Sequence, residues 1–269
     1  MSRHSLIFIG GMHRSGTTLL HEILRAHPAI SGFEATGVKR DEGQHLQTVY
    51  PPASDFGGPG RFGFNPASFM DETHPLATPD NAGKLFAEWR PYWDLEKQYL
   101  LEKSPPNLVR TRFLQQLFPS AHFIILLRHP VAVAYATRKW CKTSIPSLIE
   151  HSLLCYERFE ADRPFLQRVR VIRYEELVFD PRTQIQGVLD WMGLAPFDFS
   201  HSIDPCLNDK YFAQWKADRK SALQRWFGIL SGWSAKEADL EKRSLPFGYS
   251  LREPGALLPL KSKQESALI

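Results

Sequence analysis

The chain has 269 residues, of which 43% are hydrophobic and 23% charged, and its formal net charge is +4. This composition is ordinary for a soluble globular protein, and the mild positive charge without a Lys/Arg-rich arm argues against nucleic-acid binding. No stretch approaches 18 apolar residues and the three cysteines match no metal or redox spacing, so we predict one soluble, cytoplasmic domain over residues 1–269 without a membrane span.

The first two predicted elements are a strand and a helix joined by a glycine turn. Residues 6–9 form an uninterrupted apolar run that ends at Gly10 and Gly11. Residues 17–27 then show helical periodicity until Pro28 ends the helix. A glycine turn that leads from a strand into a helix N-terminus is a common place to bind an anion.

A long segment, at about residues 31–84, is rich in Gly, Pro, Asp and Asn and has little periodicity. A segment of this kind inside a compact domain is usually functional. We predict that it is an irregular insertion that lines the acceptor site, with one short helix around residues 42–49.

The remaining elements alternate between helices and strands. Helices are predicted over residues 83–97, 108–118, 131–140, 145–159 and 183–192, and strands over residues 99–101, 122–127 and 169–172. This alternation predicts an α/β fold with a central parallel β-sheet flanked by helices, in a three-layer sandwich like that of P-loop NTPases. In such folds ligands bind at the carboxyl ends of the strands.

The first loop, residues 11–18, has the spacing of a phosphate-binding Walker A loop with one change. Thr17 stands where that motif has its lysine. Without a lysine to reach the β- and γ-phosphates, nucleoside triphosphate chemistry is disfavoured, although Arg14 supplies a cation three residues earlier. The backbone N–H groups and the helix N-terminus still favour a phosphate-like group.

The string Arg14-Ser15-Gly16-Thr17-Thr18 resembles the 5′-phosphosulfate loop of the sulfotransferases that use 3′-phosphoadenosine 5′-phosphosulfate (PAPS). The resemblance implies that Arg14 bridges to the departing phosphate and that Ser15, Gly16, Thr17 and Thr18 bind the 5′-phosphate. It also implies an enzyme that moves the sulfuryl group of PAPS to a hydroxyl and releases adenosine 3′,5′-bisphosphate (PAP).

A second match surrounds the strand predicted over residues 122–127. Residues 118–130 are similar to the family's F-P-x-A-x-F-I…R-x-P segment, whose arginine, here Arg128, binds the 3′-phosphate of the donor. An arginine at the end of a buried strand needs an anionic partner, which agrees with this role. The family has a serine eight residues later, where this chain has Ala136 followed by Thr137. Either Thr137 substitutes for that serine after a small shift, or one 3′-phosphate contact is lost.

The resemblance extends toward the C-terminus. Residues 171–177 are similar to the family's R-Y-E-x-L segment, which implies that Tyr174 lies against the adenine. Lys210 is a weaker candidate, for covering the nucleotide. Residues 247–249, Phe-Gly-Tyr, resemble a C-terminal signature to which we give a structural role only.

Sulfuryl transfer needs cations for the sulfuryl oxygens and a base for the acceptor hydroxyl. Arg14 in the first loop is one of these cations. The second is Lys103, because the string Lys103-Ser104-Pro105 resembles the family segment whose lysine faces the sulfuryl group. For the base we favour Glu42 and keep His45, Asp41 and His13 as alternatives; on one short helix Glu42 and His45 would share a face. The scattered histidines have no metal-ligand spacing, and we expect no metal.

The acceptor is predicted to be a small-molecule or saccharide alcohol or phenol, bound with the help of aromatic residues in the segment 31–84. One rival hypothesis is a P-loop small-molecule kinase or phosphotransferase, which would need ATP, magnesium and a Walker lysine; Thr17 argues against it. The other is a non-catalytic nucleotide-binding protein, which Ala136 favours and the presence of Arg14 and Lys103 disfavours.

Overall fold

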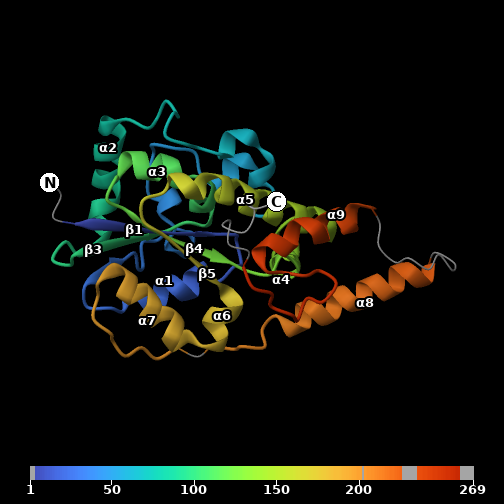
Figure 1. Ribbon diagram of the computed structural model, residues 1–269. Helices are drawn as coiled ribbons and strands as arrows, with labels where there is room; N and C mark the ends of the chain where they lie inside the picture. The colour runs from blue at the N-terminus through green and yellow to red at the C-terminus, as the bar shows by residue number, and fades with distance from the viewer. Residues whose placement is uncertain (1–3, 202, 226–234, 261–269) are drawn as a thin grey trace, which may run out of the picture.

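A computed structural model of the chain describes residues 4–201, 203–225 and 235–260. Its centre is one sheet of five parallel strands in the order β2-β3-β1-β4-β5 (Figure 1). In chain order the strands are β1 (Ser5–Gly11), β2 (Ile30–Gly32), β3 (Tyr99–Lys103), β4 (His122–Leu127) and β5 (Val169–Arg173). The predicted parallel sheet is confirmed, whereas the three-residue edge strand β2 was not predicted.

The register of the sheet brings three strand ends together. β1 lies between β3 and β4, with Ile9 opposite Lys103 and Gly11 opposite Leu126. β5 extends the sheet on the far side of β4. Because all strands run in the same direction, the loop after β1, Lys103 at the end of β3 and the residues that follow β4 meet at one carboxyl edge.

Helices cover both faces of the sheet and complete three layers (Figure 1). One face carries α1 (Thr17–Arg25), α6 (Tyr174–Phe179) and α7 (Pro181–Met192), and the other carries α2 (Pro79–Trp89), α3 (Thr111–Leu117), α4 (Pro130–Thr137) and α5 (Ile145–Asp162). β1 is apolar on both sides: Ile7 and Ile9 pack with the first group of helices and Phe8 with the second. A strand buried on both faces requires such an uninterrupted apolar run.

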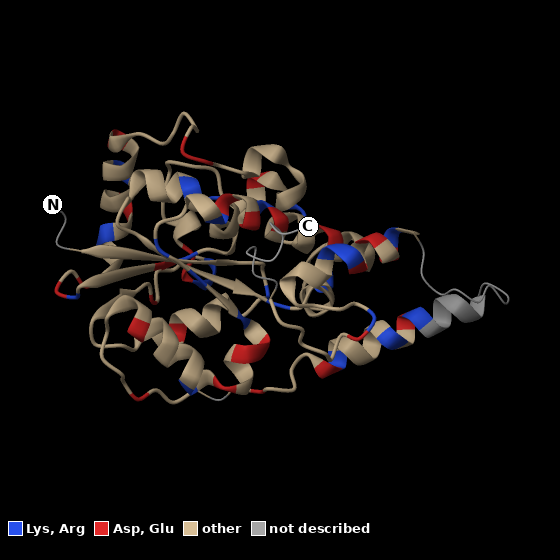
Figure 2. Cartoon of the chain, viewed as in Figure 1, with Lys and Arg blue, Asp and Glu red and all other residues tan. Residues whose placement is uncertain are grey.

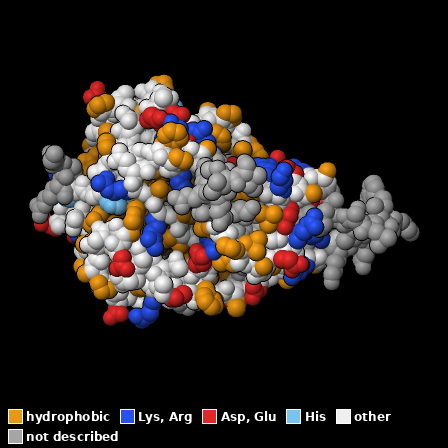
Figure 3. Space-filling model, in the orientation of Figure 1, with side chains coloured by type: hydrophobic (Ala, Val, Ile, Leu, Met, Phe, Trp, Pro, Cys, Tyr) orange, Lys and Arg blue, Asp and Glu red, His pale blue; other side chains and the backbone are white. Residues whose placement is uncertain are grey.

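Two further helices, α8 (Asp209–Arg225) and α9 (Ala235–Ser244), lie near the C-terminus. α8 packs on α4, and α9 packs on α5, where the Arg243 guanidinium pairs with the Glu157 carboxylate at 2.7 Å. Charged residues of both signs lie along α8 and α9 (Figure 2), and both signs are interspersed on the face drawn in Figure 3. None of the helices within the described ranges is both long and apolar enough to cross a membrane.

The prediction of a helix over residues 42–49 was wrong. The chain forms only a 3-10 turn there, at Gly43–His45. The backbone N–H groups of Gly43 and Gln44 donate to the Glu102 carboxylate and the Ser104 hydroxyl, each at 3.0 Å. In an α-helix over residues 42–49, the N–H groups of Thr48 and Val49 would donate to the carbonyls four residues earlier. They donate instead to the Glu88 carboxylate at 2.7 Å and to the Gln47 side-chain oxygen at 2.6 Å.

The helix predicted over residues 83–97 is shifted toward the N-terminus. α2 begins at Pro79, where the Thr78 hydroxyl accepts a hydrogen bond from the Asn81 N–H at 3.2 Å and caps the helix. It ends at Trp89, and a 3-10 turn over Arg90–Tyr92 follows. Apolar periodicity located the helix but not its cap, which a single hydroxyl decides.

Candidate active site

A cavity of about 480 Å³ opens at the carboxyl edge of the sheet. Nine of the residues predicted for the site line it, namely His13, Arg14, Gly16, Thr17, Thr18, Glu42, His45, Arg128 and Tyr174. The lining also contains residues that the sequence did not single out, among them Lys39, Arg40, Trp140 and Asp204. The fold thus joins the predicted phosphate loop to the long irregular segment around a single space.

The loop between β1 and α1 is shaped for an anion. Arg14 and Gly16 adopt positive φ angles of 70° and 96°, and a Cβ atom on Gly16 would lie 2.5 Å from the Tyr174 ring. The Ser15 hydroxyl and the Arg14 Nε are buried without a hydrogen-bond partner among the described residues. α1 starts at Thr17 with no acidic residue in its first turn. The unused donors and the positive end of the helix favour an anionic group in the loop.

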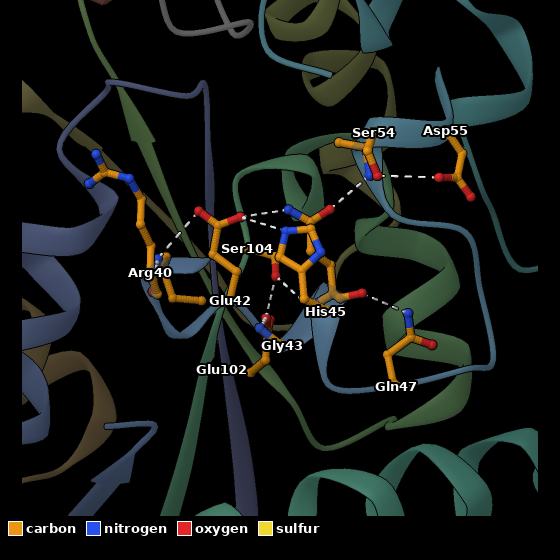
Figure 4. Close-up of polar contacts among 12 residues, drawn as sticks. Arg40, Glu42, Gly43, His45, Gln47, Ser54, Asp55, Glu102 and Ser104 are labelled. Atoms are coloured by element: carbon orange, nitrogen blue, oxygen red, sulfur yellow. Dashed lines mark hydrogen bonds and ion pairs between the residues drawn. The ribbon is translucent and has the colours of Figure 1, made fainter. Parts of the chain in front are cut away.

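Glu42 lies between the buried Lys103 and His45, and Figure 4 shows its contact with His45. Its Oε1 is 3.5 Å from the Lys103 Nζ, while its Oε2 accepts a hydrogen bond from the Gln44 amide at 2.6 Å and lies 3.9 Å from the His45 Nε2. Lys103 is fully buried and donates to the Arg40 carbonyl at 2.8 Å. Burial lowers the pKa of Lys103, and the Glu42 carboxylate opposes that shift. Lys103 is not itself part of the lining and meets the site through Glu42 and Arg40.

The other two candidates for the base are less well placed. Asp41 is outside the lining, and its Oδ1 accepts hydrogen bonds from the Thr36 N–H and hydroxyl at 2.8 and 2.6 Å. Burial would raise the pKa of Asp41, but these hydrogen bonds bring it below its ordinary value. His13 lines the cavity, but burial, ahead of nearby positive charges, lowers its pKa to about 3, so the ring is a weak base. This geometry favours Glu42 and His45.

Glu102 was not predicted, yet it holds the segment that carries Glu42. Its fully buried carboxylate accepts hydrogen bonds from the Ser104 hydroxyl at 2.5 Å, the Asn107 amide at 2.6 Å and the Gly43 N–H at 3.0 Å. Burial raises its pKa to about 7, and the first two of these hydrogen bonds oppose the shift. A Cβ atom on Gly43 would lie 2.5 Å from the Glu102 side chain, so the two segments touch closely. In the sequence, Glu102 is a single carboxylate directly after the apolar run 99–101, and this signal could have identified it.

Arg128 follows β4 and faces the glycine loop, as predicted. Its Nη1 donates to the Arg14 carbonyl at 2.6 Å, and its Nε and Nη2 donate to the Asn208 Oδ1 at 3.0 and 2.6 Å. Its guanidinium carbon lies 4.1 Å from the centroid of the Tyr174 ring. Burial lowers the pKa of Arg128, and the neighbouring Tyr174 and Glu175 oppose the shift. These hydrogen bonds go to neutral groups, so no carboxylate of the described chain pairs directly with this cation.

Four residues of the predicted donor site, Ser15, Ala136, Thr137 and Lys210, do not line the cavity. Ala136 and Thr137 are buried at the end of α4, and the Thr137 hydroxyl has no hydrogen-bond partner within the described ranges. Lys210 is exposed on α8, with its Nζ 5.1 Å from the Tyr211 ring. Their contacts with the donor stay predictions. Tyr249, from the predicted C-terminal signature, is fully buried and donates to the Glu175 carboxylate at 3.1 Å, as a structural residue would.

Trp140 is a lining residue that the sequence did not reveal. It ends the 3-10 turn after α4 and is 37% exposed. The guanidinium carbons of Arg14 and Arg40 lie 5.0 and 5.5 Å from its ring centroid, and the Lys39 Nζ lies 5.8 Å away. Cations over an indole ring are favourable, and here they connect the phosphate loop to the segment that carries Glu42.

Comparison with known proteins points to one family. The model of the "Sulfotransferase family" matches residues 6–198. Among curated proteins, the chain is 26% identical over 206 residues to protein-tyrosine sulfotransferase 2 of Gallus gallus, an alignment that covers 71% of this chain and 51% of the relative. It is also 26% identical over 230 residues to the nodulation protein NoeE of Sinorhizobium fredii (strain NBRC 101917 / NGR234), covering 71% and 50%. The chain therefore spans about half the length of these curated relatives.

Solved structures share the fold at low sequence identity. The sulfotransferase domain of the Synechococcus PCC 7002 olefin synthase aligns with a TM-score of 0.52 and 20% identity, covering 91% of this chain and 94% of that domain. Sulfotransferase STF9 of Mycobacterium avium aligns with a TM-score of 0.54 and 13% identity, covering 98% and 79%. These likenesses concern the arrangement of the strands and helices.

Proposed function

This chain belongs to the sulfotransferase family, and we propose that it transfers the sulfuryl group of PAPS to the hydroxyl of a small-molecule or saccharide acceptor. The observation that carries the proposal is that Arg14 and Glu42 line one cavity while the buried Lys103 lies 3.5 Å from the Glu42 carboxylate, so that two cations and a carboxylate come from three segments of the chain. All three lie within the region that the family model matches. The name of one curated relative refers to protein tyrosine, so a phenolic hydroxyl belongs among the acceptors to test.

The residues of the cavity fit a phosphorylated nucleotide donor. The unpartnered Ser15 hydroxyl and Arg14 Nε, together with the N-terminus of α1, suit the 5′-phosphosulfate. Arg128, which has no direct carboxylate contact within the described ranges, suits the 3′-phosphate. Tyr174 presents an aromatic ring to the same cavity and would hold the adenine.

The catalytic work divides between charge stabilisation and proton removal. When bound, PAPS supplies the sulfuryl group and leaves as PAP. Arg14 and Lys103 place fixed positive charge where negative charge develops, and such preorganised groups need no rearrangement during the reaction. Glu42 accepts the proton of the acceptor hydroxyl, and His45, 3.9 Å from its Oε2, is the alternative base. Lys103 also positions the segment that bears the base, because it donates to the Arg40 carbonyl.

The kinase hypothesis is not favoured by the family match or by the loop. Thr17, at the position of the Walker lysine, begins α1 and cannot supply a charge to a β- or γ-phosphate. A non-catalytic nucleotide-binding protein would keep the donor site and lack turnover. Only a transfer assay distinguishes that alternative from the proposed function.

The test begins with calorimetric titration of the protein with PAP, without magnesium. We expect binding that Arg128→Ala weakens strongly, while thermal unfolding of the variant and the milder Arg128→Lys show that the fold is intact. The second step is transfer of ³⁵S from labelled PAPS to phenols, saccharides and tyrosine peptides. Binding of ATP–Mg²⁺ in place of PAP would overturn the proposal in favour of a kinase. PAP binding without transfer to any acceptor would favour the non-catalytic protein.

A further inference from the structure

Two positive side chains at the mouth of the cavity have no task in the proposed donor site. Lys39 and Arg40 both line the cavity and are exposed. In the part of the chain that the structure describes, neither side chain forms an ion pair with a carboxylate. The nearest acidic residue in sequence, Asp41, is occupied by the Thr36 N–H and hydroxyl.

Positive side chains outnumber carboxylates in the lining of the cavity. The lining has four positive side chains against two carboxylates, Arg14, Lys39, Arg40 and Arg128 against Glu42 and Asp204. Of these four cations, Arg14 and Arg128 belong to the proposed donor site. Lys39 and Arg40 lie on the segment that carries Glu42, where they are placed to meet the acceptor.

Trp140 concentrates this positive charge in a small volume. The charged groups of Arg14, Arg40 and Lys39 lie within 5.0 to 5.8 Å of its ring centroid. Because these groups surround one ring, their like charges repel one another, and the walls of a cavity strengthen their common field. An anion held among them removes this repulsion.

The backbone of the segment is held in an unfavourable shape that places these side chains. Ala35, Arg40 and Asp41 adopt positive φ angles of 52°, 58° and 50°, which non-glycine residues rarely do. The Thr36–Asp41 hydrogen bonds and the Lys103 Nζ on the Arg40 carbonyl maintain this shape. In Figure 4 the Arg40 side chain extends away from the Glu42 carboxylate. Backbone strain of this kind is typical of functional segments.

We propose that Lys39 and Arg40 form a subsite for an anionic group of the acceptor, which is therefore an alcohol or phenol that carries a carboxylate, sulfate or phosphate. The inference rests on the proposed sulfotransferase function and specifies its substrate class. The Arg40 carbonyl accepts a hydrogen bond from the Lys103 Nζ, and Glu42 follows two residues later in the chain. The anionic group consequently lies near the reacting hydroxyl, on the same ring or on a neighbouring one.

The test compares matched ligands on matched variants. The double variant Lys39→Gln/Arg40→Asn removes both charges, and asparagine tolerates the left-handed backbone at position 40. Lys139→Gln is the control, because the Lys139 Nζ lies 5.9 Å from the same Trp140 ring but outside the lining. Each protein, saturated with PAP, is titrated with 4-hydroxyphenylacetate and its methyl ester, and with methyl glucuronide and methyl glucoside.

We expect wild type and Lys139→Gln to bind the anionic member of at least one pair about tenfold more tightly than its neutral counterpart. In the double variant this preference should disappear while the Kd for PAP stays the same, and in wild type it should shrink with added salt. Equal affinity for both members of both pairs, including the case in which none binds, overturns the proposal. A parallel loss of PAP binding in the double variant also overturns it, because the two cations would then serve the donor. Binding of PAP to wild type is measured first. If wild type does not bind PAP, that result counts against the proposed function itself.

Discussion

The Nζ of Lys103 and the Oε1 of Glu42 lie 3.5 Å apart, so a buried cation contacts the carboxylate that we propose as the base. Two adjacent residues of β3 anchor the segment that bears this carboxylate. Lys103 donates to the Arg40 carbonyl at 2.8 Å, and Glu102 accepts from the Gly43 N–H at 3.0 Å. The base is thereby held from both sides by one strand end, and the predictions below test this arrangement.

Replacing Glu42 should slow turnover strongly without changing the affinity for the donor. We expect Glu42→Gln to lower kcat by about 10²- to 10⁴-fold, because the amide cannot accept the proton of the hydroxyl. His45→Asn should have a smaller effect. The measurement is ³⁵S transfer from PAPS at saturating donor, with the Kd for PAP as the control. If His45→Asn proves the more damaging of the two, His45 is the base and Glu42 its positioning partner.

Glu102 should make the protein less stable as the pH rises from about 4.5 to about 7. Its pKa is raised from 4.5 to about 7 in the folded state. The folded protein therefore binds more protons than the unfolded chain in this interval, and the free energy of unfolding falls as the pH rises through it. The full shift corresponds to roughly 3 kcal/mol. Glu102→Gln, which cannot titrate, should lack this loss.

Urea unfolding of wild type and Glu102→Gln at about pH 5 and about pH 8 measures the effect. The buried histidines titrate in the opposite sense, since burial lowers the pKa of His129 and His151 to about 3. Both proteins contain these histidines, so the difference between wild type and variant isolates Glu102. Identical pH dependence in the two proteins would show that Glu102 is ionised throughout.

Two glycines with different surroundings make a matched pair for substitution. Gly43→Ala would bring a Cβ atom to 2.5 Å from the Glu102 side chain, and we expect about 1–3 kcal/mol of destabilisation with a reduced kcat. Gly83, inside α2, has no atom within 4 Å of an added Cβ, and Gly83→Ala should stabilise by about 0.5–1 kcal/mol. Thermal unfolding and ³⁵S transfer measure both. Normal activity of Gly43→Ala would contradict the close packing of the two segments.

Asn208 should control the affinity for the donor through Arg128. Its Oδ1 accepts from the Arg128 Nε and Nη2, and its Nδ2 donates to Glu175 at 2.8 Å. Hydrogen bonds to a charged group contribute about 1.5–3 kcal/mol, so Asn208→Ala should weaken PAP binding by at least about tenfold. Calorimetric titration checks this. Asn65→Ala, at an exposed turn outside the cavity, is the control and should bind PAP normally.

Much of the proposed site for the PAPS donor could be predicted from short strings of sequence. The loop of residues 11–18, the strand before Arg128 and the position of Lys103 are each local features, because an apolar run, a glycine turn and a charged residue follow one another in the chain. Parallel strands bring such strand ends to one edge, so their meeting also followed from the predicted fold. The positions of Ala136, Thr137 and Lys210 relative to the cavity did not follow, since they depend on how α4 and α8 pack.

The sequence by itself determined the fold class, because this depends on periodicity. It also predicted the phosphate loop and the cations Lys103 and Arg128, because these depend on neighbours in the chain. Only the tertiary structure decided that residues 42–45 form an extended residue and a tight turn, and that Lys39, Arg40 and Trp140 face the same cavity. The physical reason is that distant side chains satisfy the N–H groups of this segment. Glu102 and Ser104 accept from Gly43 and Gln44, and Glu88 accepts from Thr48, whose N–H an α-helix would have needed. Local propensity contains no information about such partners, which become available only when β3 and α2 are in place beside the segment.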